Sequence, residues 1–363
     1  MLGLARGGRW WALSALSVYL YLAGFTWVIH QGGAHAAERL EPRRFGPFEP
    51  MGSGDARQRT PPYRRILQGP DGYSLEFGFK NFNGDVLSVK ASLDSGTVSD
   101  SVREFGYSQD ELDDLDAWYK RSQESAIAAA KGRYVSGKVT AKTRAELARK
   151  MERLKAQNAR IEQELDRTIA DLAREYRRRR LEVFDRSGFR LKGKGILEVD
   201  IPAMVRRNWK RVRPVALSFA DLSRRRGYDA EDLVGAASAM VQTAMRYEVP
   251  GRSEGSRVIA GMLPPPKALA LGQGDCDTKT AVLASILMSW PNLRMVGLSI
   301  PGHYLMAVQR VPRSGDVFIE HEGFPFVMIE SAGPAWLPPG RVGDTTRAYL
   351  EAGNSFGIQP LDL

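Results

Sequence analysis

Hydrophobic and polar residues follow different patterns in successive parts of the chain, and the first pattern is an uninterrupted apolar run. Residues 10–29 contain no charged side chain. In a helix that rises about 1.5 Å per residue, this run matches a hydrocarbon core of about 30 Å. Arg6 and Arg9 precede the run, and positive residues favour the cytoplasmic side of a membrane. Residues 1–36 are therefore predicted to form a single-pass transmembrane signal anchor, with the rest of the chain exported.

Two other interpretations of this segment stay open. Ala34-His35-Ala36, followed by Ala37, has the small-x-small pattern that signal peptidase cleaves. The apolar run is longer than the about 7 to 15 residues of a cleaved signal, which favours an uncleaved anchor. A buried core helix is the third interpretation. The Trp and Tyr residues near the two ends of the run argue against it, because such residues gather at membrane interfaces.

The next pattern changes from irregular to alternating. Residues 37–62 are rich in Pro, Gly and Arg without an apolar period, which predicts a linker. Apolar and polar residues then alternate over 73–93, on both sides of Asn83-Gly84. Asn-Gly readily adopts the positive φ angles of a tight turn, so a β-hairpin is predicted within a small unit spanning 63–107. A two-stranded hairpin is marginal alone and must pack on something else.

A helical period follows over residues 108–186. Ser108, with Glu111 three residues later, predicts the start of a first helix. A second helix is predicted over about 140–183, because residues there recur at alternating spacings of four and three, which is typical of a coiled-coil seam. The partner across this seam is either the first helix or a second copy of the chain in a homodimer. The polar Asn158 within the seam could fix the register. The seam residues are Leu147, Met151, Leu154, Asn158, Ile161, Leu165, Thr168 and Leu172.

The remaining chain has the composition of a compact α+β domain over 195–345, followed by a C-terminal tail over 346–363. Asp229 predicts the N-cap of a helix that runs to about residue 246. The Pro- and Gly-bearing stretch 252–271 predicts an irregular loop. The predicted fold class is therefore α+β, with an N-terminal transmembrane helix, a small β-hairpin unit and a long helical hairpin or coiled coil before this domain.

The sequence around the single cysteine carries the strongest chemical signal. In LGQGDCDTKTAVLASILMSW, an apolar helix begins near Cys276. The unpaired N–H groups and the dipole at a helix N-terminus favour a thiolate, so we expect the pKa of Cys276 to be lowered. The same amides can hold an oxyanion, with the Cys276 N–H as one donor and the Gln273 side chain or a neighbouring amide as the second. Asp275 and Asp277 are expected to cap the helix rather than to do chemistry.

A base and an orienting acid follow the cysteine in the sequence. His303 comes after the turn Pro301-Gly302 and opens a predicted strand, and Glu330 lies near the end of the strand that comes after it. Pairing of the two strands would bring His303 and Glu330 side by side, so that the carboxylate could fix the imidazole tautomer. His321 is the competing base. The competing acids are Asp316, Glu320 and Glu322.

The order of these motifs resembles the transglutaminase-like superfamily of papain-fold cysteine enzymes, particularly its bacterial envelope members. The resemblance rests on GDCDTKTAVLASIL, GHYLMAV and MIESAGP, and on MVQTAMRYEVPG and PPPKALALGQGDC upstream, within residues 229–342. It implies that residues 195–345 form a transglutaminase-like cysteine domain. It also implies that Cys276 is the nucleophile, His303 the base and Glu330 the orienting acid.

Composition adds two constraints. The net charge of +10 includes arginine runs without interleaved aromatic residues, which favours anionic lipid or polymer over nucleic acid as a partner. A chain with one cysteine cannot form an internal disulfide, so an exported chain that keeps one invites a functional explanation.

The expected function is that of a membrane-anchored cysteine protease, amidase or acyltransferase acting on an amide through a Cys-His-Glu triad. Its expected location is a bacterial inner membrane, with the C-terminal domain in the periplasm or outside the cell. A protein or peptide substrate is expected, cell-wall peptides included, and this chemistry needs no cofactor and no metal. The alternative is a catalytically idle, membrane-tethered scaffold or binding protein that uses the coiled coil and the basic surface.

Overall fold

The computed structural model describes residues 60–362, so the predicted anchor and most of the linker lie outside it. Helices and strands alternate along this part of the chain in a mixed α+β fold. None of the described helices is long and apolar enough to cross a membrane. The chain divides into two compact units: a helical unit formed by Phe105–Gly188 and Arg252–Ile259, and a mixed unit formed by the remaining described residues.

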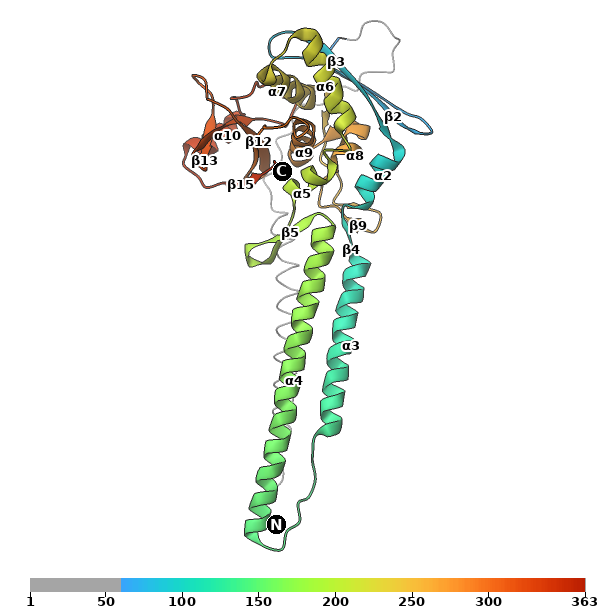
Figure 1. The fold of residues 1–363 in the computed structure, drawn as a ribbon, viewed down its shortest axis with the longest axis vertical. Helices are drawn as coiled ribbons and strands as arrows, with labels where there is room; N and C mark the ends of the chain where they lie inside the picture. The colour runs from blue at the N-terminus through green and yellow to red at the C-terminus, as the bar shows by residue number, and fades with distance from the viewer. Residues whose placement is uncertain (1–59, 363) are drawn as a thin grey trace. The chain divides into compact units, whose positions relative to one another are not determined.

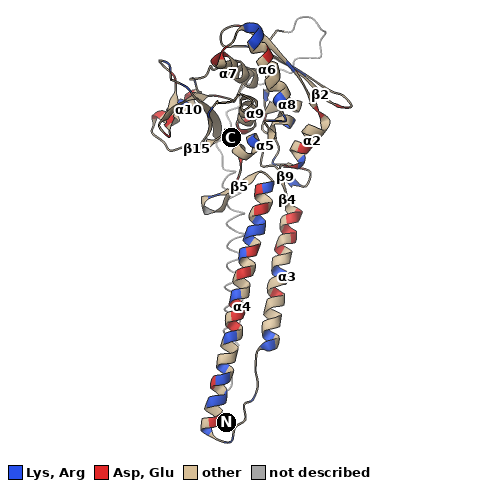
Figure 2. Cartoon of the chain, in the orientation of Figure 1, with Lys and Arg blue, Asp and Glu red and all other residues tan. Residues whose placement is uncertain are grey.

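The helical unit consists mainly of two antiparallel helices, α3 (Gln109–Arg133) and α4 (Arg144–Arg186), which lie side by side (Figure 1). The predicted helical hairpin is therefore present, and within the chain α3 packs along α4. Ser108 precedes α3 as predicted, but its side chain makes no capping hydrogen bond. Lys and Arg alternate with Asp and Glu along α4 (Figure 2), as expected of a solvated helix supported by pairs one turn apart.

At the far end of the helical unit, residues 134–143 connect α3 to α4 without forming a helix. α4 continues beyond the end of α3, so Leu147 and Met151 remain partly exposed. Asn158 binds this segment directly, because its side-chain amide contacts the N–H and the carbonyl of Val135 at 3.1 and 3.0 Å. At the other end of the unit, β4 (Tyr107–Ser108), β9 (Arg257–Val258) and β8 (Ser253–Glu254) form a small sheet in that order.

The mixed unit begins with the predicted hairpin, which has gained a third strand. β2 (Gly72–Lys80) and β3 (Val86–Asp94) pair antiparallel, and β1 (Tyr63–Gln68) pairs with the other edge of β2. Helix α6 (Arg213–Arg226) covers this sheet, with the rings of Phe79 and Phe219 6.2 Å apart. The hairpin thus has the packing partner that its marginal stability required. A short helix, α2 (Ser95–Arg103), follows β3 in place of further hairpin structure.

Helix α9 (Cys276–Leu287) is central to the mixed unit, because every one of its residues except Asp277 is buried. A helix that is apolar on all sides must be packed on all sides, and several other helices contact it. They are α5 (Ile201–Asn208), α6, α7 (Ala230–Ala239) and α8 (Pro265–Leu271).

Two predictions near these helices are wrong in detail. α8 occupies part of the stretch that was expected to be an irregular loop, since Pro at its first positions has the fixed φ of a helix start. α7 is capped by Asp229 as predicted, with a capping box completed by Asp232, but it ends at Ala239 and passes into η2 (Met240–Ala244). η2 is a π-helical turn, a feature that often occurs at functional sites.

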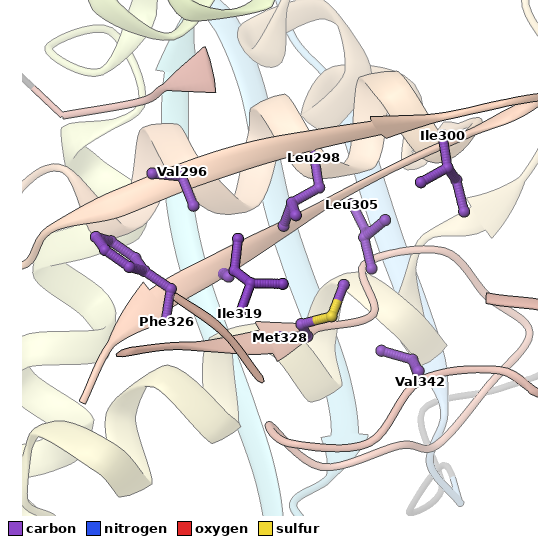
Figure 3. Close-up of a cluster of buried hydrophobic side chains, with 9 residues drawn as sticks. Val296, Leu298, Ile300, Leu305, Ile319, Phe326, Met328 and Val342 are labelled. Carbon is purple, nitrogen blue, oxygen red and sulfur yellow. The ribbon is translucent and has the colours of Figure 1, made fainter. Parts of the chain in front are cut away.

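Five strands form the second sheet of the mixed unit. Their order is β13 (Phe318–His321), β14 (Phe324–Ile329), β12 (His303–Gln309), β11 (Met295–Ile300) and β15 (Gly357–Pro360), and all neighbours are antiparallel. Alternate residues of β11 and β12 contribute to a buried apolar cluster with β13 and β14 (Figure 3). A separate pair, β5 (Phe189–Lys192) and β6 (Ile196–Val199), lies earlier in the chain.

Residues 346–363 differ from the predicted tail. They include most of α10 (Asp344–Glu351) and all of β15, which pairs with β11. Tyr349, Leu350 and Ile358 pack against the apolar cluster. Sequence pattern alone missed these elements because a short helix and a short edge strand gain their stability from tertiary contacts.

Candidate active site

Cys276 is the first residue of α9, at the edge of the buried core. Asp275 is the N-cap, as predicted, and its carboxylate accepts a hydrogen bond from the Thr278 N–H at 3.1 Å. Gly272 ends α8 with a φ of 64°, a left-handed conformation that suits glycine and turns the chain toward α9. The thiol is therefore held at the end of a rigid helix, with Cys276 only 8% exposed.

His303 and Glu330 meet at neighbouring strand ends. His303 is the first residue of β12, Glu330 directly follows β14, and these two strands are paired. His303 Nε2 lies 3.0 and 3.2 Å from the two carboxylate oxygens of Glu330. Glu330 is itself buried, and its Oε1 also accepts a hydrogen bond from the Ala332 N–H at 3.1 Å. The pairing of strands thus brings these two side chains together, as the sequence predicted.

Helix α9 is joined to both of these strand ends. The Tyr304 backbone lies close enough to the Cys276 thiol to lower its pKa slightly, against the larger effects that raise it. One turn further along the helix, the Thr280 hydroxyl lies 3.3 Å from the Tyr304 carbonyl and 2.9 Å from the hydroxyl of Ser331. Thr280 and Ser331 are fully buried. The thiol therefore lies beside the residue that follows His303, and the same helix fixes the segment that begins at Glu330.

The expected lowering of the Cys276 pKa is wrong for this arrangement. Burial raises the pKa of the Cys276 thiol well above its ordinary value, and the negative charges of Asp277 and Asp275 raise it further. The thiol donates a hydrogen bond to Asp277 Oδ1 at 3.3 Å. The helix N-terminus stabilises a thiolate, whereas burial and the two adjacent carboxylates destabilise it. The destabilising effects are the larger ones. A pKa raised in this way favours the neutral thiol of Cys276 over the thiolate.

The pKa of His303 is also raised, which for an imidazole favours the charged form. Burial by itself lowers the pKa of His303, but the hydrogen bond and charge of Glu330, with the charge of Asp277, outweigh burial and raise it. A raised pKa means that the imidazolium is stabilised once a proton arrives. Because Nε2 faces Glu330, Nδ1 is the ring nitrogen left for the thiol or a substrate.

Gln273, the candidate oxyanion donor, is already engaged. It lies in β10 (Gln273–Gly274), which runs parallel to β7 (Arg246–Tyr247). Its side-chain amide donates to Glu248 Oε1 at 2.9 Å, and its carbonyl oxygen accepts from Arg246. One of the two N–H groups of the Gln273 amide is thus engaged by Glu248, and the Cys276 N–H, the second Gln273 N–H and a neighbouring amide remain candidate donors.

The competing residues lie in other surroundings. His321 packs against the Phe326 ring, with centroids 6.0 Å apart. Asp316 forms an ion pair with Arg310 at 2.9 Å. No metal site is formed either, because no three His, Cys, Asp or Glu side chains between residues 60 and 362 are grouped to hold an ion.

Sequence reasoning missed three buried polar residues near the site. Gln242 lies in η2, while Lys279 and Thr280 lie one turn after Cys276 in α9. All three are buried, and their contacts lead to the segment that begins at Glu330. A signal was available, because Lys, Thr and Gln interrupt otherwise apolar stretches. Tyr247 was also missed: partial burial raises the pKa of its phenol, and the nearby carboxylates of Asp275, Asp277 and Glu330 raise it further.

Comparisons with protein-family models, with curated proteins and with solved structures find no match to this chain.

Proposed function

We propose that the mixed unit is a papain-like, transglutaminase-like cysteine hydrolase or acyltransferase, tethered by residues 1–36 to a bacterial inner membrane and acting on the periplasmic or outer side. The observation that supports it most is the part-buried His303–Glu330 pair near the N-terminus of α9, where the backbone of the residue after His303 lies close to the Cys276 thiol. A nucleophile, a base and a group that orients the base are the three roles this chemistry needs. The sequence resemblance points to the same three residues.

The proposed first step forms a tetrahedral intermediate. Cys276 Sγ attacks the carbonyl carbon of an amide while its proton passes to His303 Nδ1. Because the resting thiol is neutral, His303 acts as a general base at the moment of attack rather than as half of a preformed ion pair. Glu330 stabilises the imidazolium, and the backbone N–H of Cys276 faces the developing oxyanion.

The second step regenerates the thiol. The C–N bond of the tetrahedral intermediate breaks, and the leaving amine takes the proton from His303. Water or a second amine then attacks the thioester, giving an acid or a new amide, and its proton passes through His303 to the departing Cys276 sulfur. Water makes the protein a protease or amidase, and an amine makes it an acyltransferase, depending on how well the thioester is shielded from water. The proposed substrates are proteins or peptides, cell-wall peptides included.

The test is acylation of the full chain in detergent micelles by p-nitrophenyl acetate. Cys276 is the only cysteine, so an acyl group that hydroxylamine removes, detected by intact-mass spectrometry, reports on this residue. We expect a stoichiometric burst of nitrophenolate that is absent in Cys276→Ala and slowed about 100-fold or more in His303→Ala. His321→Ala is the matched control and should react like the native chain.

The opposite outcome has a definite meaning. If the native chain forms no thioester, or if His303→Ala reacts as fast as His321→Ala, then the thiol and the imidazole do not work together. The protein would then be an idle scaffold or binding protein. Its partner site would be sought on the α3–α4 hairpin.

A further inference from the structure

One side chain of the core, that of Gln242, binds both ends of the segment 330–337, which begins at Glu330. Gln242, in the π-helical turn η2, donates from Nε2 to the Glu330 carbonyl at 2.6 Å and to the Leu337 carbonyl at 2.8 Å. Its Oε1 accepts a hydrogen bond from the Leu337 N–H at 2.9 Å. A single buried amide therefore joins both ends of the segment 330–337 to the helix that precedes the active site.

The backbone of Gln242 is fastened in turn by a buried lysine. Lys279 is fully buried in α9, one turn after Cys276, and its Nζ lies 3.3 Å from the Gln242 carbonyl. The charged groups that act on Lys279 are Glu330, after β14, and Arg64, in β1. Burial lowers the pKa of Lys279 to about 7, while the charge of Glu330 opposes that shift. Burying an amine costs free energy unless the amine is paired. The position of Lys279 therefore argues for a role beyond filling space.

Gly333 allows the segment to approach this close. A Cβ atom at position 333 would lie 2.0 Å from the Gln242 carbonyl oxygen and 3.1 Å from Lys279 Nζ. Any side chain there would push the segment away from η2. The backbone of the segment is thus in contact with the turn whose side chain binds its two ends.

We infer that Gln242 is a positioning residue for the proposed triad, with Lys279 and Gly333 as its supports: it holds Glu330 against His303 through the Glu330 carbonyl. This inference rests on the proposed function. The geometric reason is that the carbonyl and the carboxylate belong to one residue, and the carboxylate must lie within about 3 Å of His303 Nε2 to orient the ring. Neither Gln242 nor Lys279 contacts the thiol, so neither is assigned a catalytic step.

The test measures the pKa of His303 by NMR in the full chain, labelled at histidine Cε1 and held in detergent micelles. His303→Gln identifies its signal, and Glu330→Gln sets the scale by removing the charge that raises the pKa. We expect Gln242→Met, which keeps the length of the side chain but removes its polar atoms, to lower the pKa of His303 by about one unit. Gly333→Ala should shift the pKa in the same direction without changing the Gln242 side chain.

Two controls separate positioning from general stability. Thr243→Val removes a 2.7 Å hydrogen bond to Ala239 from the same turn, and Ser238→Ala removes the 3.1 Å contact to Gln242 that does not involve the segment. Both should leave the pKa of His303 unchanged while lowering the melting temperature by a few degrees. If Gln242→Met does not fold, Gly333→Ala alone decides the question.

The inference is overturned if Gln242→Met and Gly333→Ala fold and leave the pKa of His303 at its native value while Glu330→Gln lowers it. That result is distinct from failure of the proposed function, which would appear as absence of thioester in the native chain. An unchanged pKa together with normal acylation would mean that the paired strands and the Thr280–Ser331 contact position Glu330 without Gln242.

Discussion

Replacing Asp277 by Asn should make the nucleophile more acidic. The thiol donates to Asp277 Oδ1 at 3.3 Å, so a thiolate would face a carboxylate at nearly that distance. Two unit charges so placed repel by about 1 kcal/mol in water and by about 5 kcal/mol at an effective dielectric constant of about 20. Because Asp277 is only half-buried, we expect the lower part of that range, about 1 to 3 kcal/mol, which lowers the pKa of Cys276 by about 1 to 2 units.

The assay is the pH dependence of iodoacetamide alkylation of the full chain, read by mass spectrometry, with Cys276 as the only thiol. Each unit by which the pKa of Cys276 falls increases the thiolate fraction at pH 7 about tenfold, but a less basic thiolate is also less nucleophilic. The alkylation rate at pH 7 should therefore rise by about 3- to 12-fold. Asp166→Asn removes an equal charge from an exposed position of α4 and is the matched control.

One result would refute the electrostatic reasoning. If Asp277→Asn alkylates with the same pH midpoint as Asp166→Asn, burial alone holds the proton on Cys276. A midpoint that moves to higher pH would mean instead that Asp277 takes the proton from the thiol and acts as a base.

Three further predictions concern stability. Leu298→Ala empties part of the apolar cluster of Figure 3 and should lower the free energy of unfolding by about 2 to 5 kcal/mol in denaturant titrations, whereas Leu217→Ala, on an exposed position of α6, should change it by less than about 0.5 kcal/mol. Asn158→Ala should speed amide hydrogen exchange at Val135, whose N–H it binds, by about tenfold while α3 and α4 stay helical by circular dichroism; unchanged exchange would contradict this. The folded-state pKa of His303 is raised, so its stabilising effect is complete below about pH 6.5 and is lost as pH rises through the folded pKa. The unfolding free energies of the native chain and of His303→Gln should therefore converge above that range. A difference that widens with rising pH would contradict the assigned sign.

The local patterns of the sequence were sufficient where one element carries its own signal. The Ser108 and Glu111 pattern predicted α3, a coiled-coil period predicted α4, and the Asn83-Gly84 turn predicted the pairing of β2 with β3. The start of α9 at Cys276 followed from Asp275 and the apolar run behind it, and the strand ends at His303 and Glu330 followed from alternation and a glycine turn. In each case a few neighbouring residues determine the backbone.

Only the tertiary structure decided the protonation of Cys276 and the contacts that hold Glu330 in place. The thiol is neutral because burial in the core and two carboxylates outweigh the helix terminus, and burial is not a property of the GDCD motif. Gln242 reaches Glu330 across 88 positions of sequence, a contact no periodicity encodes. The short strand β15 is stabilised by its antiparallel pairing with the edge of β11. The sequence determined which side chains can form the site, whereas long-range packing determined their protonation and their contact partners.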